Sequence, residues 1–224
     1  MIRIGITGHR LNKLPEATRR AVRLALSRTF SLLDRALAQS GPGQTRRDIE
    51  IVSALAEGVD RMAVEAAPPS WRLAALLPTP RRDYERDFLA EGETASASLD
   101  DFRTLLGRAT SVTELPIVGS DDVNEDVARS QQYSALASRL VRQIDLLVAV
   151  WDGGPAEGPG GTAHVIEEGT RCGMRVIWID PRRPEDAQVL SGFVAGDLAQ
   201  PIVSRLEASA FATLIEAGLG SRPA

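Results

Sequence analysis

Short apolar segments alternate with amphipathic segments along the first 80 residues, and this alternation is the strongest constraint on the fold. Largely apolar runs at 2–8, 49–53 and 72–77 have the length of buried strands, and the first is rich in β-branched residues. Between them, at about 15–39 and 60–67, apolar residues recur at helical spacing. Strands that alternate with helices form a parallel sheet with right-handed crossovers. The sequence therefore predicts an α/β domain.

The rest of the chain continues this pattern to about residue 180. The expected elements are a helix at 99–109, a short strand at 111–115, a helix at 123–142, the clearest buried strand at 144–151, a helix at 162–172 and a strand at 175–179. Residues 79–98 look irregular, and after residue 180 we expect one loop and a final helix near 201–217. We predict a single Rossmann-like three-layer domain over residues 1–224, with a mainly parallel sheet and helices on both faces.

Composition limits the kinds of site that the chain can hold. The formal net charge of −4 disfavours binding to nucleic acid. The single cysteine, Cys172, excludes an internal disulfide, and two histidines disfavour a multi-histidine metal site. No apolar run approaches about 18 residues, and the N-terminus has no signal-peptide pattern. We expect a cytoplasmic protein with no metal, no bound cofactor, and no membrane or nucleic-acid partner.

The first candidate site is the sequence Thr7-Gly8-His9-Arg10, which follows the first predicted strand. Gly8 permits a tight turn and a close approach of the backbone to a ligand. Arg10 has the geometry to bind a phosphate, and His9 can hydrogen-bond or stack. The alternative is an ordinary strand-to-helix turn with its polar side chains in solvent. No further glycine completes the dinucleotide-binding pattern G-x-G-x-x-G.

The second candidate site is the segment SALAEGVD from Ser53 to Asp60, which contains Glu57 and follows the second predicted strand. Gly58 lies between a strand and a helix, where free backbone N–H groups attract anions. Asp60 has alternative roles, because a carboxylate at this place repels phosphate. It either caps its own helix, accepts a hydrogen bond from a ribose hydroxyl, or braces the first loop.

The third candidate site is the segment from Asp152 to Thr162, in which five glycines follow the buried strand that ends at Trp151. Glycines allow close backbone approach, and we expect Thr162 to cap the next helix. This segment is the best phosphate cradle in the chain. It is not a Walker loop, because no lysine follows the glycines. The alternative is a flexible surface loop.

Two tyrosines complete the candidates. Tyr84 lies in a charged segment after Pro78, which ends the third strand, and is the better candidate for a lid; the alternative is that the charged run 81–87 is a solvated face. Tyr133 lies on the apolar stripe of its helix, where core packing is favoured over stacking on a base. The candidate ligand-binding residues are Thr7, Gly8, His9, Arg10, Ser53, Glu57, Gly58, Asp60, Pro78, Tyr84, Trp151, Asp152, Gly153, Gly160, Gly161 and Thr162.

Together these segments resemble the SLOG superfamily, the Rossmann-like fold shared by DNA-processing protein A and the LOG phosphoribohydrolases. Residues 7–10 resemble the first-strand motif of its sensor-like members, and residues 53–60 resemble its Gly-x-Asp motif. Residues 151–153 and 160–162 resemble its glycine-rich motif, which ends in Gly-Thr. The resemblance covers residue 1 to about residue 180. It implies a nucleotide or nucleotide-derived ligand.

The superfamily contains N-glycosidic hydrolases of nucleoside monophosphates and non-catalytic sensors of prokaryotic conflict systems. The hydrolases carry a glutamate three residues after the motif threonine and an arginine on the preceding helix; these positions hold Val165 and Leu136 here. The resemblance therefore implies a sensor without catalytic residues. Hydrolysis, with Asp60, Glu57 or Asp152 as a substitute carboxylate, remains the alternative. A sensor implies a separate effector protein, and related folds imply a homo-oligomer.

Overall fold

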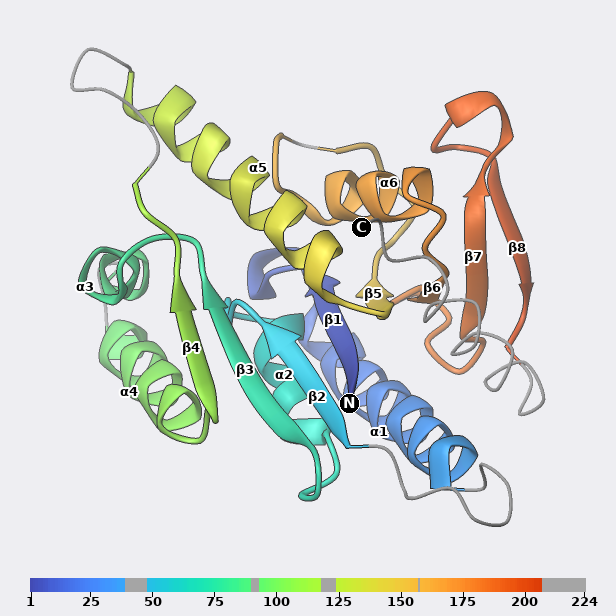
Figure 1. Ribbon diagram of the computed structural model, residues 1–224, viewed down its shortest axis with the longest axis horizontal. Helices are drawn as coiled ribbons and strands as arrows, with labels where there is room; N and C mark the ends of the chain where they lie inside the picture. Colours follow the sequence, from blue (N-terminus) through green and yellow to red (C-terminus); the bar gives the residue numbers. More distant parts are fainter. Residues whose placement is uncertain (39–47, 90–92, 118–123, 157, 207–224) are drawn as a thin grey trace.

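The described residues form one eight-stranded sheet with helices on both faces (Figure 1). The structure is a computed structural model and describes residues 1–38, 48–89, 93–117, 124–156 and 158–206. The strand order is β4-β3-β2-β1-β5-β6-β7-β8. Neighbours from β4 to β6 pair in parallel, and β7 pairs antiparallel with β6 and β8. The predicted fold class, α/β with a mainly parallel sheet, is confirmed.

The elements have the following bounds. The strands are β1 Ile2–Gly8, β2 Ile49–Ser53, β3 Arg72–Leu77, β4 Ser111–Glu114, β5 Leu146–Val150, β6 Val176–Ile179, β7 Gln188–Phe193 and β8 Pro201–Arg205. The α-helices are α1 Glu16–Ala38, α2 Val59–Ala66, α3 Arg81–Tyr84, α4 Glu93–Gly107, α5 Glu125–Gln143 and α6 Thr162–Arg171. The 3-10 helices are η1 Leu11–Lys13, η2 Glu85–Phe88 and η3 Val194–Gly196.

The helices cover the sheet as two layers, each with its own hydrophobic cluster. On one face, α1, α2 and α4 pack through residues such as Phe30, Met62 and Phe102. On the other face, α5 and α6 pack through residues such as Leu140 and Ile166. The central strands β2 and β5 are buried at every position. This burial on both faces explains why β5 reads as a continuous apolar run in the sequence, whereas β2 also holds Glu50, which pairs with Arg3.

The C-terminal part of the described chain differs from the sequence prediction. Residues 201–205, where we expected the start of a final helix, form β8 instead, and β7 lies in the expected loop. Ile202 and Val203 are β-branched and favour a strand. Pairing with β7 supplies hydrogen bonds between distant segments that local periodicity cannot reveal. Residues 207–217 of the expected helix lie outside the described residues.

The segment 79–98 also differs from the prediction, because much of it is helical rather than irregular. It holds α3 and η2, and α4 begins at Glu93 rather than near Leu99. Tyr84 and Phe88 are buried against Phe102, with ring centroids 5.6 and 4.9 Å away. The charged residues between the aromatics hid this cluster in the sequence. Residues 90–92 lie outside the described residues.

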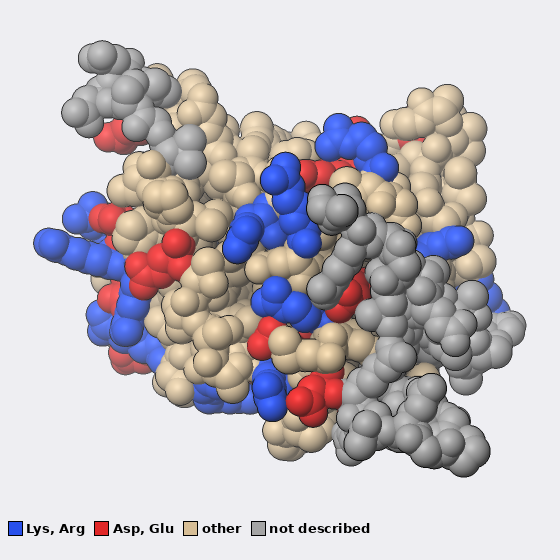
Figure 2. All heavy atoms as spheres, in the orientation of Figure 1, with Lys and Arg blue, Asp and Glu red and all other residues tan. Residues whose placement is uncertain are grey.

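The other predicted elements agree with the structure within about two residues, and β1, β2 and β3 have the predicted bounds. Over the residues that the structure describes, no helix combines the length and apolar character that a membrane crossing requires. On the face shown in Figure 2, Lys and Arg side chains lie among Asp and Glu side chains.

Candidate functional site

A cavity of about 310 Å³ lies beside the carboxyl ends of the central strands. The crossover helix α2 lies on one face of the sheet and α6 on the other, so the strand order reverses direction beside β1. Open α/β sheets bind ligands at such a reversal. Residues from all three candidate segments line this cavity, which we call the main cavity. Gly8 and Gly161 therefore lie at the same edge of the sheet.

The loops after β1 and β2 are held together by close contacts at two glycines. A Cβ added at Gly8 would lie 2.5 Å from Cγ1 of Val59. Gly58 has a φ of 97°, and a Cβ there would lie 2.5 Å from the carbonyl oxygen of His9. The Val59 N–H donates to that same oxygen at 3.2 Å. Gly58 thus makes room for the neighbouring loop and does not line the main cavity.

Asp60 braces the loop that follows β2. Its side chain is buried, and its Oδ2 accepts hydrogen bonds from Ser53 Oγ at 3.1 Å and the Ala54 N–H at 3.2 Å. The N-cap of α2 is Gly58, so Asp60 does not cap its own helix. Burial raises the pKa of the Asp60 carboxyl to about 6, against the lowering effect of its hydrogen bonds. Leu55 in this loop has a φ of 58°, a left-handed conformation that is uncommon outside glycine.

Arg10 brings a positive charge to the main cavity. Its Nη2 donates to Tyr133 Oη at 3.0 Å, and its guanidinium lies 5.9 Å from the centre of that ring. Among the described residues, no carboxylate lies within 4.0 Å of the guanidinium. Partial burial lowers the pKa of Arg10, but the side chains of Tyr133, Tyr84 and Asp87 outweigh that effect and raise it. The side chain therefore stays charged and is available to an anion.

The end of the glycine-rich loop leads into α6 beside the main cavity. Gly160 has a φ of 76° and packs against the backbone of Tyr133, and its N–H donates to His164 Nδ1 at 2.6 Å. Gly161 has ordinary angles, φ −67° and ψ 166°, and is the N-cap of α6. Thr162 is therefore the first helical residue and not the expected cap, and no side chain caps α6. An uncapped helix start leaves N–H donors for an anion.

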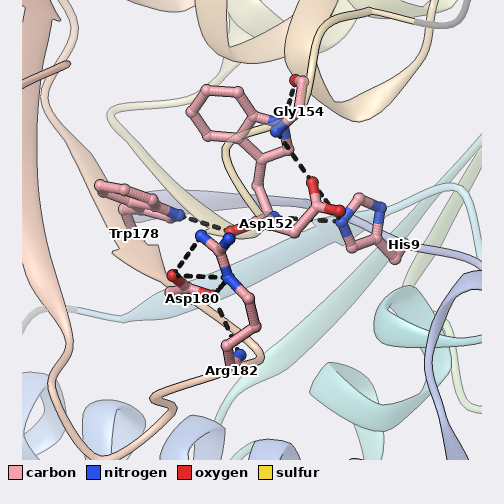
Figure 3. Close-up of polar contacts among 7 residues, drawn as sticks. His9, Asp152, Gly154, Trp178, Asp180 and Arg182 are labelled. Atoms are coloured by element: carbon pink, nitrogen blue, oxygen red, sulfur yellow. Dashed lines mark hydrogen bonds and ion pairs between the residues drawn. The ribbon is translucent and has the colours of Figure 1, made fainter. Parts of the chain in front are cut away.

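The beginning of the same loop is fixed by polar contacts outside the cavity (Figure 3). His9 Nε2 lies 3.1 Å from the backbone N of Asp152 and 3.2 Å from its Oδ1. Partial burial raises the pKa of Asp152, but the Gly154 N–H and His9 outweigh that effect and lower it. Trp151 is buried and donates from Nε1 to the Gly154 oxygen at 2.9 Å. Figure 3 also shows Trp178, Asp180 and Arg182 beside these contacts, with Trp178 Nε1 donating to the Trp151 oxygen at 2.7 Å and Arg182 paired with Asp180.

The opposite wall of the main cavity is apolar. It is formed by side chains from β1, β3, α5 and α6, namely Ile6, Leu76, Leu136, Ala137, Leu140 and Val165. Val165 and Leu136 are two of these side chains. Both positions do face the cavity here, and the side chains present cannot transfer a proton or hold a charge.

The two tyrosines do not have the expected roles. Tyr84 is 1% exposed and lies inside the aromatic cluster with Phe88 and Phe102, so it is not a lid. Tyr133 is half-buried and lines the main cavity instead of packing in the core. Its Oη contacts Arg10 at 3.0 Å and Asp87 Oδ2 at 2.9 Å. Sequence periodicity placed Tyr133 on the inner face of α5 but could not show that a cavity lies there.

The main cavity thus contains only part of the predicted set. The predicted residues that line it are Thr7, Gly8, His9, Arg10, Asp60, Tyr84, Gly160, Gly161 and Thr162. The predicted residues that do not line it are Ser53, Glu57, Gly58, Pro78, Trp151, Asp152 and Gly153. Glu57 accepts a hydrogen bond from Ser98 Oγ, and the Pro78 oxygen accepts one from Gln132. Asn12 and Lys13 of η1 also line the cavity, and no sequence signal marked them.

Comparison with known proteins gives one structural similarity and no family match. No family model matches the chain, and no curated protein matches it. Among solved structures, the chain is similar to TM1055, a structural genomics target, with 17% sequence identity and a TM-score of 0.43. The match covers 79% of this chain and 73% of that chain. Among the described residues, no group of three or more His, Cys, Asp or Glu side chains is placed to hold a metal ion.

Proposed function

We propose that the protein binds a nucleotide or nucleotide-derived ligand in the main cavity and acts as a non-catalytic sensor in a prokaryotic signalling or defence system. The observation that carries the proposal is the pairing, at one cavity, of the charged Arg10 with the uncapped start of α6. A guanidinium and a helix N-terminus both favour an anion, and phosphate suits both.

The rest of the cavity supports a nucleotide rather than a simple anion. Its volume of about 310 Å³ exceeds the needs of a lone phosphate and lies in the range of small-molecule sites. The apolar wall from α5 and α6 offers a surface for a flat, weakly polar group such as a base. The Tyr133 ring beside Arg10 adds an aromatic surface.

The sensor role rests on the resemblance to the SLOG superfamily together with the chemistry of the cavity wall. Cleavage of an N-glycosidic bond needs a charged group near the ribose. Val165 and Leu136 supply none at the two positions where the hydrolases carry theirs. A sensor acts through a partner, so the proposal includes a separate effector protein and self-association of this chain.

One observation favours a second candidate function, the N-glycosidic hydrolysis of nucleoside monophosphates. Asp60 lines the main cavity, and a carboxyl with a pKa of about 6 is suited to general acid catalysis. Chromatography of AMP, GMP, CMP and UMP after long incubation with the protein distinguishes the two functions. We expect all four to be recovered intact. Release of free base that disappears in Asp60→Asn would replace the sensor with a hydrolase.

The binding proposal is tested by thermal unfolding with a panel of mononucleotides, dinucleotides, cyclic nucleotides and ADP-ribose. A ligand at about 100 times its Kd adds roughly 2.7 kcal/mol to the free energy of unfolding, which raises Tm by several degrees. Arg10→Ala should weaken binding by roughly 1.5–3 kcal/mol, because it removes a charge-assisted hydrogen bond. Arg20→Ala is the matched control, since Arg20 is exposed on α1 and lines no part of the cavity.

Nucleosides without phosphate should shift Tm far less than their phosphorylated forms. Two results contradict the proposal. One is a panel in which no compound shifts Tm. The other is a shift that Arg10→Ala and Arg20→Ala leave equally unchanged, because the phosphate would then lie elsewhere.

A further inference from the structure

A second cavity, of about 200 Å³, adjoins the main cavity between the α3–η2 segment and α5. We call it the side cavity. It is lined by Pro78, Thr79, Asp83, Tyr84, Asp87, Ile117, Ala128, Arg129, Gln132 and Tyr133. Tyr84 and Tyr133 line both cavities, so these two side chains form the boundary between them.

The hydroxyl of Tyr84 is buried and has no hydrogen-bond partner among the residues that the structure describes. The residue is 1% exposed, and its ring is fixed edge-on by Phe88 and Phe102. A buried polar group without a partner has an unfavourable free energy, because it has lost its hydrogen bond to water. A ligand atom that accepts a hydrogen bond here would remove that cost. A ligand that moved the Tyr84 ring enough to expose this hydroxyl would therefore gain a hydrogen bond from it.

The lining of the side cavity combines polar groups with a small apolar surface. Asp87 and Arg129 form two parallel hydrogen bonds of 2.9 Å, so the Asp87 charge is compensated and does not repel an anionic ligand. Asp83 and Thr79 add further oxygen atoms. Ala128, Ile117 and Pro78 form the apolar part. Carboxylate acceptors, hydroxyls and a flat apolar patch match a ring that carries several hydroxyl groups.

A short chain of contacts joins the two cavities. Arg10 in the main cavity donates to Tyr133 Oη at 3.0 Å, and the same Oη donates to Asp87 Oδ2 at 2.9 Å on the side-cavity side. Arg129 lies 5.3 Å from the centre of the Tyr133 ring, and Arg10 lies 5.9 Å from it. A group attached directly to a phosphate at Arg10 is therefore long enough to reach the carboxylate of Asp87.

We propose that the side cavity binds a sugar attached to the far side of the ligand's phosphate. The ligand class is then a nucleoside diphosphate that carries a glycosyl group, with the nucleotide in the main cavity and the sugar hydroxyls on Asp87, Asp83 and Thr79. This inference rests on the proposed function, because it places the phosphate at Arg10. The glycosyl group is a hexose or a second ribose, which present the same hydroxyl chemistry.

Calorimetric titration of matched pairs tests the inference. The probes are ADP, GDP, CDP and UDP, each beside its glucose conjugate, with ADP-ribose as the pentose arm. For the base that the protein prefers, we expect a glycosyl conjugate to bind at least tenfold more tightly than the free diphosphate. Ala128→Leu fills part of the side cavity, and it should remove this gain while the affinity for the free diphosphate stays the same. Val127→Leu is the matched control, since Val127 is exposed on α5 and lines neither cavity.

Tyr84→Phe provides a second variant that should keep its fold. Removal of the unpartnered hydroxyl should leave the Tm of the free protein unchanged or higher, while the affinity for the conjugate falls several-fold. If the free diphosphates bind but no conjugate binds more tightly, the side cavity is not a sugar subsite and the proposed function stands. The same conclusion follows if Ala128→Leu leaves the gain intact. If no nucleotide binds at all, both proposals are wrong.

Discussion

The loops after β2 and after β5 both join a buried strand to a helix through glycine, and they differ in what surrounds Gly58 in the first and Gly161 in the second. In the first loop, Gly58 lies so close to the carbonyl of His9 that a Cβ would clash with it. Asp60 accepts hydrogen bonds from Ser53 Oγ and from the Ala54 N–H of this loop. The second loop is anchored at its beginning by Asp152 and His9. At its end, a Cβ added at Gly161 would meet, among the described residues, just the oxygen of Gly158, at 3.3 Å.

A glycine-rich motif therefore indicates a place where another group comes close to the backbone, but it does not show whether that group belongs to the protein or to a ligand. In the loop after β2 the approaching group is another part of the protein, and the loop forms a fixed wall. In the loop after β5 the space beside Gly161 belongs to the main cavity. Three predictions test this contrast between the two loops.

The largest effect is expected for a change from glycine to valine in the closed loop. Gly58→Val should lower the free energy of unfolding by about 3 kcal/mol or more, because it combines an unfavourable positive φ with a clash at the His9 carbonyl. Gly161→Val should cost less than about 1 kcal/mol, since its φ of −67° suits any residue. It should nevertheless abolish the Tm shift by nucleotide. Urea unfolding with and without ligand measures both, and equal losses of stability in the two variants would refute the contrast.

The second prediction concerns pH, because the carboxylates of the two loops respond in opposite directions. The pKa of Asp60 rises from 3.8 to about 6 on folding, so its stabilising contribution is complete below about pH 3.8 and is lost as pH rises through 6. A rise of two pKa units corresponds to about 3 kcal/mol. The pKa of Asp152 is lowered on folding, so its contribution is present above pH 3.8 and is lost as pH falls.

Unfolding free energies of Asp60→Asn and Asp152→Asn, measured from about pH 3 to pH 7, separate these effects, with the Asp152 trend expected below about pH 3.8 and the Asp60 trend above it. Relative to the unmodified protein, Asp60→Asn should gain stability as pH rises over this range. Asp152→Asn should show a smaller trend with the opposite sign, because Asp152 is half exposed and solvent screens its interactions. Parallel pH profiles for the unmodified protein and Asp60→Asn would show that the Asp60 carboxyl titrates as it does in an unfolded chain.

The smallest effect is expected at Thr162. A threonine at an N-cap contributes about 1 kcal/mol, whereas Thr162 is the first helical residue and makes no capping hydrogen bond. Thr162→Ala should therefore change the free energy of unfolding by less than about 0.5 kcal/mol. Thr170→Ala on the same helix is a suitable comparison, since its hydroxyl bonds to the Ile166 oxygen. A loss near 1 kcal/mol at Thr162 would mean that the start of α6 is capped after all.

The sequence by itself determined the parallel part of the sheet and the edge on which the candidate segments meet. Buried strands consist mostly of apolar residues, and helices that cover a sheet have one apolar face. The local pattern of apolar residues therefore predicts both kinds of element. Parallel strands end at the same edge, which brings residues 7–10, 53–60 and 158–162 together once the strands are known. For this reason the main cavity was predicted in outline.

The tertiary structure alone decided what each side chain does at that edge. Tyr133 meets Arg10 across 123 residues of sequence and Asp87 across 46, and such distant pairs leave no periodic trace. Tyr84 is fixed in the lining of the main cavity because its ring packs against Phe88 and Phe102. Residues 201–205 form β8 because they pair with β7. Local propensity sets which segments become strands and helices. The packing of segments against one another determines which polar groups face a cavity and which form hydrogen bonds within the protein.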